Sequence, residues 1–309
     1  MNTMKHILNT FWRINIKQIF ILCVICTIAY SAKAETITIE PLFEYPIAPE
    51  ELETLTAKSN WLMQHFWDNM DFKKKGAVDQ IALNDAMKIY ALPMQWAEKS
   101  EVDKSVNNLI SKIAKNPTLQ VQFTKAAEEN LYGQRAQIWI DEIYIKFIEG
   151  LLKNKKLSDA RKVRYRRQLN ILNNTLVGNT APSFDFVTPT GNPGRYQPIG
   201  VFTIIEFGDP DCDDCRHAKL KMETNVRFSS LVDRGLVNIL FIIPDPNDGW
   251  QTKLAGYPSK WVIGASDTVA DVVDIRTTPS FLIVGKDGKI IAKNASVEQA
   301  MNLALKENE

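Results

Sequence analysis

The stretch TIIEFGDPDCDDCRHAKLKM, residues 203–222, decides the fold of the second half of this chain. It starts with β-branched and apolar residues, which are typical of a buried strand. It then places Cys212 and Cys215 two residues apart, among four aspartates, where a helical pattern begins. This C-x-x-C spacing fits three kinds of site: a metal clip, a small structural disulfide, or a pair that cycles between dithiol and disulfide.

The cellular compartment bears on this choice, because disulfides persist in oxidising compartments. Residues 1–34 contain basic side chains, then an apolar run, then the small-residue sequence AKA, which is the layout of a cleaved secretory signal. The apolar run is shorter than the about 20 residues that a membrane anchor needs. We therefore expect cleavage after Ala34 and a periplasmic location. The other two cysteines lie in the apolar run and leave with the signal, so the mature chain keeps one cysteine pair.

Residues 35–175 read as one helix after another, without strand alternation. An Asn-Pro pair at Asn116 and a Ser-Asp pair at Ser158 are typical helix starts. In RAQIWIDEIYIKFIEGLL, residues 135–152, apolar positions cover most of the circumference of a helix, which is typical of a central helix of a bundle. We expect an all-helical N-terminal domain.

Residues 176–309 follow a different pattern. Glycine and proline punctuation ends the helical half, and apolar runs then read as strands. These runs are VFTIIEF (201–207), VNILFII (237–243), SFLIV (280–284) and IIAK (290–293). With helices after Cys212 and at the end of the chain, the pattern predicts an α/β domain with a mixed central sheet flanked by helices. The cysteine pair follows a strand, and active sites gather at the carboxyl ends of strands in such sheets.

These pieces resemble the thioredoxin-like superfamily, in particular the envelope thiol-disulfide oxidoreductases related to its peroxiredoxin-like branch. The resemblance covers residues 176–309 and implies a thioredoxin-like fold. It rests, in this order, on GNTAPSFDF (178–186), TIIEFGDPDCDDC (203–215), DIRTTPSFLIVGKDGKII (274–291) and the final helix. The helical half resembles a domain of unknown function that precedes such modules in some Gram-negative bacteria, with residues 130–152 as its best-matching stretch.

The resemblance implies roles for three residues around the C-x-x-C. Cys212 would be the exposed nucleophile, and Cys215, one helical turn later, would be the resolving thiol. The unpaired backbone N–H groups of a helix N-terminus favour a thiolate at the first of these positions. Glu206 matches the position of the family's buried acid, which would move the proton of Cys215.

The resemblance also implies an edge that binds substrate. Pro279 matches the proline that is cis in the family, and the backbone of Thr278 would hold an incoming peptide as an added strand. Asp211, directly before the first cysteine, stands where many relatives have an aromatic residue, so we expect it to face the substrate.

Asp213 and Asp214 stand between the cysteines, where relatives often have glycine and proline. Carboxylates beside a thiolate disfavour its charge, so we expect these two residues to modulate the acidity of the reactive thiol and to make the disulfide relatively more stable. This expectation favours a reductant or an isomerase over a strong oxidant. The alternative is that the acids only cap the first helical turn.

A structural staple and a metal clip fit the pair less well. A disulfide that closes so short a loop removes only about 2 kcal/mol of unfolded-state entropy, which is little for a domain with a full core. A zinc site needs four ligands, and outside the signal segment the chain has only His65 and His217 as histidines. We expect no metal, and no cofactor besides the redox-active Cys212–Cys215 disulfide.

The expected function is therefore thiol-disulfide exchange with protein substrates. An upstream electron donor or acceptor of the cell envelope would exchange electrons with the cysteine pair. The chain has 37 Lys and Arg against 36 Asp and Glu, a balance that indicates no nucleic-acid partner. No stable membrane anchor is expected. The alternative is a binding protein in which the thioredoxin fold is a scaffold and the helical half recognises an envelope partner.

Overall fold

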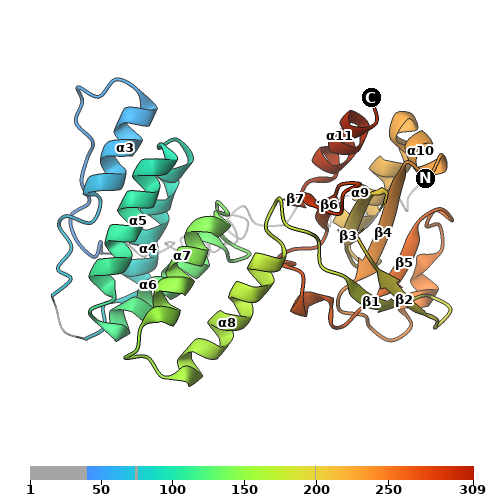
Figure 1. Cartoon of the computed structure of the whole chain (residues 1–309). Coiled ribbons are helices and arrows are strands. Elements are labelled where there is room, and N and C mark those ends of the chain that lie inside the picture. The colour runs from blue at the N-terminus through green and yellow to red at the C-terminus, as the bar shows by residue number, and fades with distance from the viewer. Residues whose placement is uncertain (1–39, 74–75, 199) are drawn as a thin grey trace, which may run out of the picture. The chain divides into compact units, whose positions relative to one another are not determined.

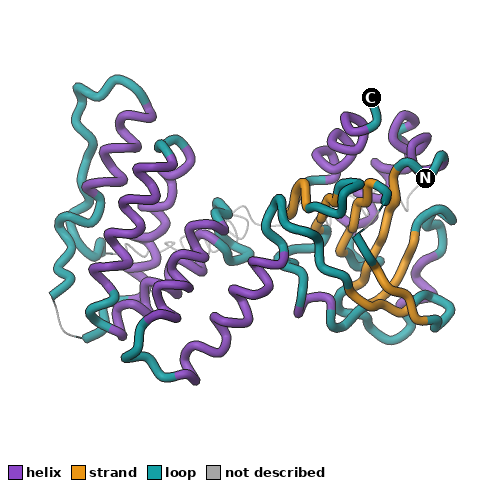
Figure 2. Tube along the Cα trace, viewed as in Figure 1, coloured by secondary structure: helices purple, strands orange, loops and turns teal. Residues whose placement is uncertain are grey.

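The computed structural model describes residues 40–73, 76–198 and 200–309, and the contacts of Pro41–Glu309 group them into one unit. The predicted signal segment and its cleavage site lie outside the described residues. In these ranges, no helix is both long and apolar enough to cross a membrane. A helical half is followed by a half built on a mixed sheet, as Figure 1 and Figure 2 show. Both predicted fold classes are confirmed.

The first half consists of helices and carries its own hydrophobic core. Its helices are α3 (Leu55–His65), α4 (Gln80–Ala91), η1 (Leu92–Gln95), α5 (Lys99–Ile113), α6 (Pro117–Leu131), α7 (Asp141–Lys153) and α8 (Asp159–Asn174). The predicted start of α6 is confirmed, because the Asn116 side chain accepts hydrogen bonds from the N–H groups of Thr118 and Leu119. Ser158 is the N-cap residue of α8, as its Ser-Asp pair predicts.

Helix α7 is shorter than its apolar pattern predicts. It begins at Asp141, and residues 135–140 are not helical. The backbone N–H of Ile140 donates a 3.0 Å hydrogen bond to the carbonyl of Leu131, at the end of α6. Because the Ile140 N–H is used in this contact with α6, it is not available for the hydrogen bond to residue 136 that a longer helix α7 would need. Residues 135–140 thus form a connection that places Asp141 at the first turn of α7.

The second half is a mixed sheet in the order β2-β1-β5-β4-β3-β6-β7. Its strands are β1 (Phe184–Val187), β2 (Pro193–Tyr196), β3 (Phe202–Phe207), β4 (Val237–Ile243), β5 (Val262–Ala265), β6 (Ser280–Val284) and β7 (Ile290–Ala295). Strands β3, β4 and β5 pair in parallel, and the other pairs are antiparallel. The apolar runs do not reveal β2 or β5, because both are short and lack a buried apolar run.

Three helices supply side chains to the core on one face of this sheet: α9 (Asp213–Thr224), α10 (Val226–Asp233) and α11 (Val297–Glu307). Side chains alternate along a strand, so Phe202 and Ile204 join the helical core, whereas Ile205 and Phe207 join the core of the opposite face. That second core includes Val269 of the short helix η3 (Val269–Asp271). The alternation directs the next even-numbered residue of β3, Glu206, toward the face of the helices.

The hydrophobic cores of the two halves contain different residues. The buried cluster of the helical half draws on residues 63–172, and the two clusters of the sheet half draw on residues 181–304. No buried cluster of the described residues mixes the two halves. Each half therefore has the apolar interior that a domain needs.

Candidate active site

Glu206 is a carboxylic acid in the apolar interior of the sheet half. It lies in β3 opposite Phe241 of β4, on the face that α9 covers, and it is 0 % exposed. Neither carboxyl oxygen has a hydrogen-bond partner among the described residues. Burial raises the pKa of Glu206 to about 8, against the opposing effect of the Lys219 ammonium group. The group can therefore gain or lose a proton near neutral pH.

The two cysteines lie at the start of α9 in different surroundings. Cys212 is the N-cap residue, and its sulfur accepts a 3.2 Å hydrogen bond from the backbone N–H of Cys215. Cys212 is partly exposed, and Cys215 is fully buried. Burial, followed by the hydrogen bond with Cys212, raises the pKa of the Cys215 thiol. Both cysteines are present as free thiols.

The loop before β6 lies opposite Cys212. Ser280 of β6 pairs with Phe207 of β3, which brings the preceding residues to the edge where the cysteine pair lies. The Thr278-Pro279 peptide bond is cis, and the Cys212 thiol lies 3.9 Å from the carbonyl oxygen of Thr278. The structure thus brings together the cysteine pair, the buried acid and the proline loop.

The acids around the pair are mostly engaged with other groups. The Asp209 carboxylate accepts a 2.8 Å hydrogen bond from the Asp211 N–H and shapes the turn before the helix. The Asp211 carboxylate forms an ion pair with Lys253, and Asp213 forms one with Arg216 in the next helical turn. Asp214 lies beside them in the first turn. Basic partners therefore offset part of the negative charge that the sequence shows.

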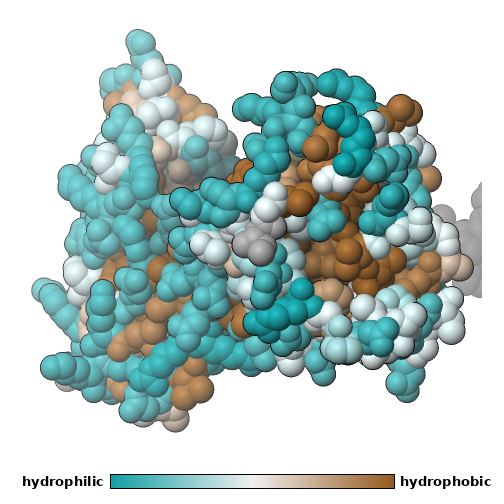
Figure 3. Space-filling view, turned by 45° about the vertical axis from the view of Figure 1, so that its right-hand side comes forward, coloured by the Kyte–Doolittle hydropathy of each residue, from teal (hydrophilic) through white to brown (hydrophobic). Residues whose placement is uncertain are grey.

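A groove of about 620 Å³ runs beside the pair, between α9 and the start of α11. Its wall is partly apolar and partly charged, and it is lined by Asp214, His217, Leu220, Pro279, Phe281 and Glu298, among others. Leu220 is 54 % exposed although it is a large hydrophobic residue. Figure 3 shows one face of the molecule, on which hydrophobic patches lie among hydrophilic side chains.

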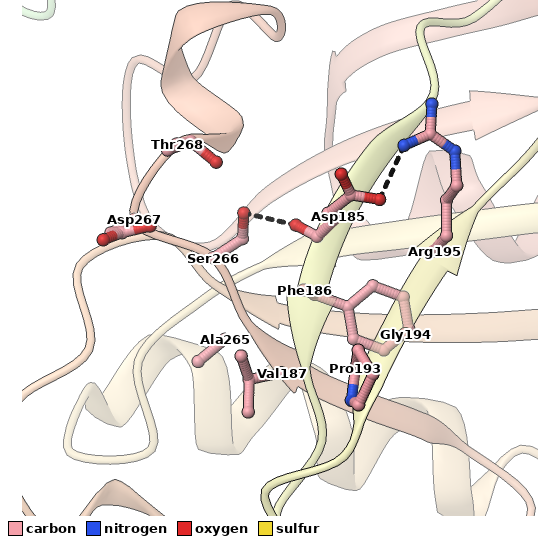
Figure 4. A pocket seen from close by; sticks show the side chains of 10 residues that line it. All are labelled: Asp185, Phe186, Val187, Pro193, Gly194, Arg195, Ala265, Ser266, Asp267 and Thr268. Carbon is pink, nitrogen blue, oxygen red and sulfur yellow. Dashed lines mark hydrogen bonds and ion pairs between the residues drawn. The ribbon is translucent and has the colours of Figure 1, made fainter.

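A second cavity, of about 400 Å³, lies away from the cysteines between β1, β2 and the end of β5. Figure 4 shows Arg195 pointing to the Asp185 carboxylate, 2.6 Å away, and Ser266 donating a 2.7 Å hydrogen bond to the Asp185 carbonyl. These polar groups satisfy one another, and none of the predicted site residues lines this cavity.

Sequence reasoning missed Tyr257, which lies in the irregular segment between β4 and β5. Its ring packs on Phe241 with centroids 5.0 Å apart, and its buried hydroxyl has no hydrogen-bond partner among the described residues. Burial raises its pKa, and the nearby charges of Glu206 and Cys215 raise it further. Only tertiary packing brings this phenol to the acid and the resolving thiol, so the sequence carries no signal for it.

Among the described residues, no group of three or more His, Cys, Asp or Glu side chains could hold a metal ion. His65, the other histidine of the described residues, lies in the helical half with its Nδ1 atom 2.8 Å from a carboxylate oxygen of Asp68.

The chain is similar to known proteins in sequence and in fold. The family model of a domain of unknown function, DUF5106, matches residues 27–175. The fold is similar to that of a thioredoxin-like protein from Bacteroides caccae, with a TM-score of 0.71 and 19 % identity over 87 % of this chain and 99 % of that chain. This likeness in fold is too extensive to involve the sheet half alone.

Two further solved structures cover less of the chain. A conserved protein of unknown function from Bacteroides fragilis is 30 % identical over 41 % of this chain and 98 % of its own, with a TM-score of 0.39. The thioredoxin domain of a thiol-disulfide oxidoreductase from Bacteroides vulgatus is 22 % identical over 42 % of this chain and 96 % of its own, with a TM-score of 0.37. None of the curated proteins matches the chain.

Proposed function

Since this chain is a thioredoxin-like protein with an N-terminal DUF5106 domain, we propose that it is a thiol-disulfide oxidoreductase acting on protein disulfides of the cell envelope. One observation carries the proposal. A partly exposed cysteine caps a helix, its buried partner lies one turn inside, and the carbonyl of Thr278 lies 3.9 Å from the exposed sulfur. A structural staple needs neither this difference in exposure nor a buried acid beneath the pair.

The proposed reaction has two steps. The Cys212 thiolate attacks one sulfur of a substrate disulfide, forms a mixed disulfide and releases the other substrate sulfur as a thiolate. Cys215 then loses its proton and attacks the Cys212 sulfur, which releases the second substrate thiolate and leaves the Cys212–Cys215 disulfide. Two electrons pass from the dithiol to the substrate. The reverse sequence oxidises a substrate dithiol.

Glu206 supports the second step as the proton acceptor for Cys215. The pKa of the buried thiol is raised, so the resolving attack needs a base close to it. The carboxylate of Glu206 acts electrostatically on Cys215, and its own pKa of about 8 lets it hold and release the proton near neutral pH. In the reverse direction Glu206 returns the proton.

The charges around the thiol support a reductant or an isomerase. Asp213 and Asp214 lie in the first turn of α9 and disfavour the thiolate. Arg216 and Lys253 pair with neighbouring acids, so the effect on the redox potential is modest. If the chain acts as a reductant, a partner in the cell envelope must reduce the Cys212–Cys215 disulfide after each turnover. The predicted signal segment would direct the chain to the envelope, where such a partner acts.

The groove beside the pair suits protein substrates. A peptide lying along it contacts Pro279, which directly follows Thr278, and the residues of α9 that line the groove. The backbone of Thr278 is partner to an extended peptide, as in strand addition to a sheet edge. Asp211 directly precedes Cys212 and pairs with Lys253, so it shapes the surface that the substrate meets next to the reactive sulfur.

Trapping in the full mature chain tests the proposal. A Cys215→Ser variant should accumulate mixed disulfides with envelope proteins and with a disulfide-containing test peptide, because it can attack but cannot resolve. A Cys212→Ser variant should accumulate none and should lose reductase activity toward the peptide. If neither the wild-type chain nor the Cys215→Ser variant exchanges with the peptide, the chain is a binding protein on a thioredoxin scaffold, and the proposal is wrong.

A further inference from the structure

A buried network of four charges lies next to the proline loop. The Arg276 guanidinium contacts Asp274 at 2.6 Å and Asp141 at 2.5 Å. The Lys293 ammonium contacts Asp141 at 2.5 Å and Asp274 at 3.0 Å. The side chains of Arg276 and Asp274 are only 3 % and 1 % exposed. The side chains of Lys293 and Asp141 are 10 % and 13 % exposed, so two positive and two negative charges balance one another in a site that is largely shielded from water.

The network joins three separate segments of the chain. Asp141 is the first residue of α7 in the helical half, Asp274 and Arg276 precede the proline loop, and Lys293 lies in β7 opposite Leu282 of β6. Arg276 and Asp141 are 135 positions apart in sequence. The helical half thus supplies one of the two carboxylates that hold Arg276.

Aromatic side chains of the helical half complete the surroundings of Arg276. Its guanidinium carbon lies 4.3 Å from the ring centroid of Tyr132 and 5.0 Å from that of Trp139, distances at which a cation is attracted to an aromatic face. The Tyr132 hydroxyl donates a 3.0 Å hydrogen bond to Asp274. Both rings belong to the connection between α6 and α7.

This arrangement limits how the loop can move. Arg276 is two residues before Thr278, whose carbonyl faces the Cys212 thiol. Moving Arg276 away from Asp141 would remove one of the two carboxylates that hold its buried guanidinium group, which is unfavourable because a buried charge loses an interaction that water does not replace. Burial by itself would raise the pKa of Asp274, but Lys293 and Arg276 outweigh it and lower the pKa, so its carboxyl group stays ionised.

We propose that Asp141 of the DUF5106 domain is a positioning residue for the active-site loop: through Arg276 it fixes Thr278 opposite Cys212 and thereby sets the affinity for a peptide substrate. The consequence for substrate rests on the proposed function, and the effect on the loop does not. The helical half then has a defined task, which is to complete the substrate-binding edge of the other half. The exposed ion pair between Arg167 and Asp271 also joins the halves, but it lies outside this network.

Three variants of the full mature chain separate positioning from simple stability. Asp141→Asn removes the carboxylate and leaves an excess positive charge. The double variant Asp141→Asn/Lys293→Met restores the charge balance but leaves Arg276 without its partner in the helical half. Asp103→Asn is the matched control, because Asp103 pairs with Lys146 at 2.6 Å within the helical half and contacts nothing in the network.

The first readout is the rate of amide hydrogen exchange in the segment that contains residues 274–282. This measurement does not depend on enzymatic activity. We expect several-fold faster exchange there in Asp141→Asn and in the double variant, and wild-type exchange in Asp103→Asn. Wild-type exchange of this segment in the charge-balanced double variant would overturn the proposal, since it would mean that Asp141 only balances charge.

The second readout is reduction of a disulfide-containing test peptide. For the double variant we expect KM to rise roughly tenfold while kcat stays within a factor of about two, because the cysteines and Glu206 are untouched. An unchanged KM with faster loop exchange would overturn the link to substrate affinity. If the wild-type chain reduces no peptide, the proposed function fails, and hydrogen exchange alone decides whether Asp141 positions the loop.

Discussion

The backbone N–H of Cys215 donates a 3.2 Å hydrogen bond to the sulfur of Cys212, so the partly exposed cysteine caps the helix that buries the other. The Cys212 sulfur thus lies at a helix N-terminus, a position that in proteins generally stabilises anions. Cys215 has the opposite setting, with a raised pKa and no exposure. One structural relationship thus assigns different tasks to two chemically identical groups.

We expect alkylation of the reduced protein to label Cys212 before Cys215. The reagent reaches the partly exposed sulfur directly, whereas Cys215 reacts only after local opening. Peptide mapping after brief treatment with iodoacetamide measures the order, and a Cys212→Ser variant serves as the control. Faster labelling of Cys215 in the wild-type chain would reverse the proposed roles.

Replacing Glu206 by Gln should flatten the dependence of stability on pH. Between about pH 4.5 and pH 8 the folded protein keeps a proton on Glu206 that the unfolded chain has released. The free energy of unfolding therefore falls as pH rises through this window, by at most about 1.4 kcal/mol per pH unit. Urea unfolding at several pH values measures the slope.

The control for this change is Glu298→Gln, because the Glu298 carboxylate is exposed and its pKa is lowered by its pairing with Lys221. The Glu298→Gln variant should show the same slope of unfolding free energy against pH as the wild type between pH 6 and pH 8. If Glu206→Gln has the wild-type slope as well, the folded protein does not hold the proton and Glu206 is not the buried acid of the mechanism.

Replacing Asp213 and Asp214 by Asn should make the redox couple more oxidising. The reduced form gains a better-tolerated thiolate, and Arg216 loses its partner Asp213 and adds positive charge nearby. Because these side chains are exposed and screened, we expect a shift of up to about 30 mV, equal to about 1.4 kcal/mol for a two-electron couple. The glutathione equilibrium measures the potential.

The same double variant also tests whether the two acids serve only the helix. In that case the protein loses about 1 kcal/mol of stability with an unchanged potential. Thermal unfolding of the reduced protein provides the comparison. A lower melting temperature with a constant potential would show that the electrostatic interpretation is wrong.

The fragment of residues 176–309 should fold cooperatively and exchange a small test disulfide. Its two hydrophobic clusters contain only residues of that half, so no apolar core is cut. It should be less stable than the same half in the full chain, because Arg276 and Lys293 lose Asp141. Circular dichroism during thermal unfolding measures this, and an unfolded fragment would contradict separate domains.

Gly208→Ala should disturb the site by crowding it. A Cβ atom at Gly208 would lie 2.7 Å from the Phe241 ring and 3.3 Å from the Cys215 sulfur. We expect a loss of about 1–3 kcal/mol of stability and slower release of mixed disulfides. The matched control is Gly150→Ala, which crowds Ile110 at 2.6 Å in the helical half and should destabilise without affecting exchange. Equal exchange rates in both variants would contradict the role of this contact.

The sequence by itself determined the features that depend on neighbouring residues. The C-x-x-C after a buried strand predicted where the helix begins, and strand alternation alone directs Glu206 to the face that the helix covers. The Asn116 cap and the strongly apolar strands were also predictable. In each case the deciding interactions lie within a few residues, or within one strand and the helix that follows it.

Only the tertiary structure decided what the charged and polar residues of the loops do. In the sequence, Asp141, Arg276 and Lys293 look like ordinary surface charges, and the network exists only because distant segments pack together and exclude water. Tyr257 reaches the Glu206 region for the same reason. Desolvation depends on every neighbour at once, so a pattern along the chain predicts that a residue is charged, whereas the packed structure decides whether that charge is exposed to water or holds the active-site loop.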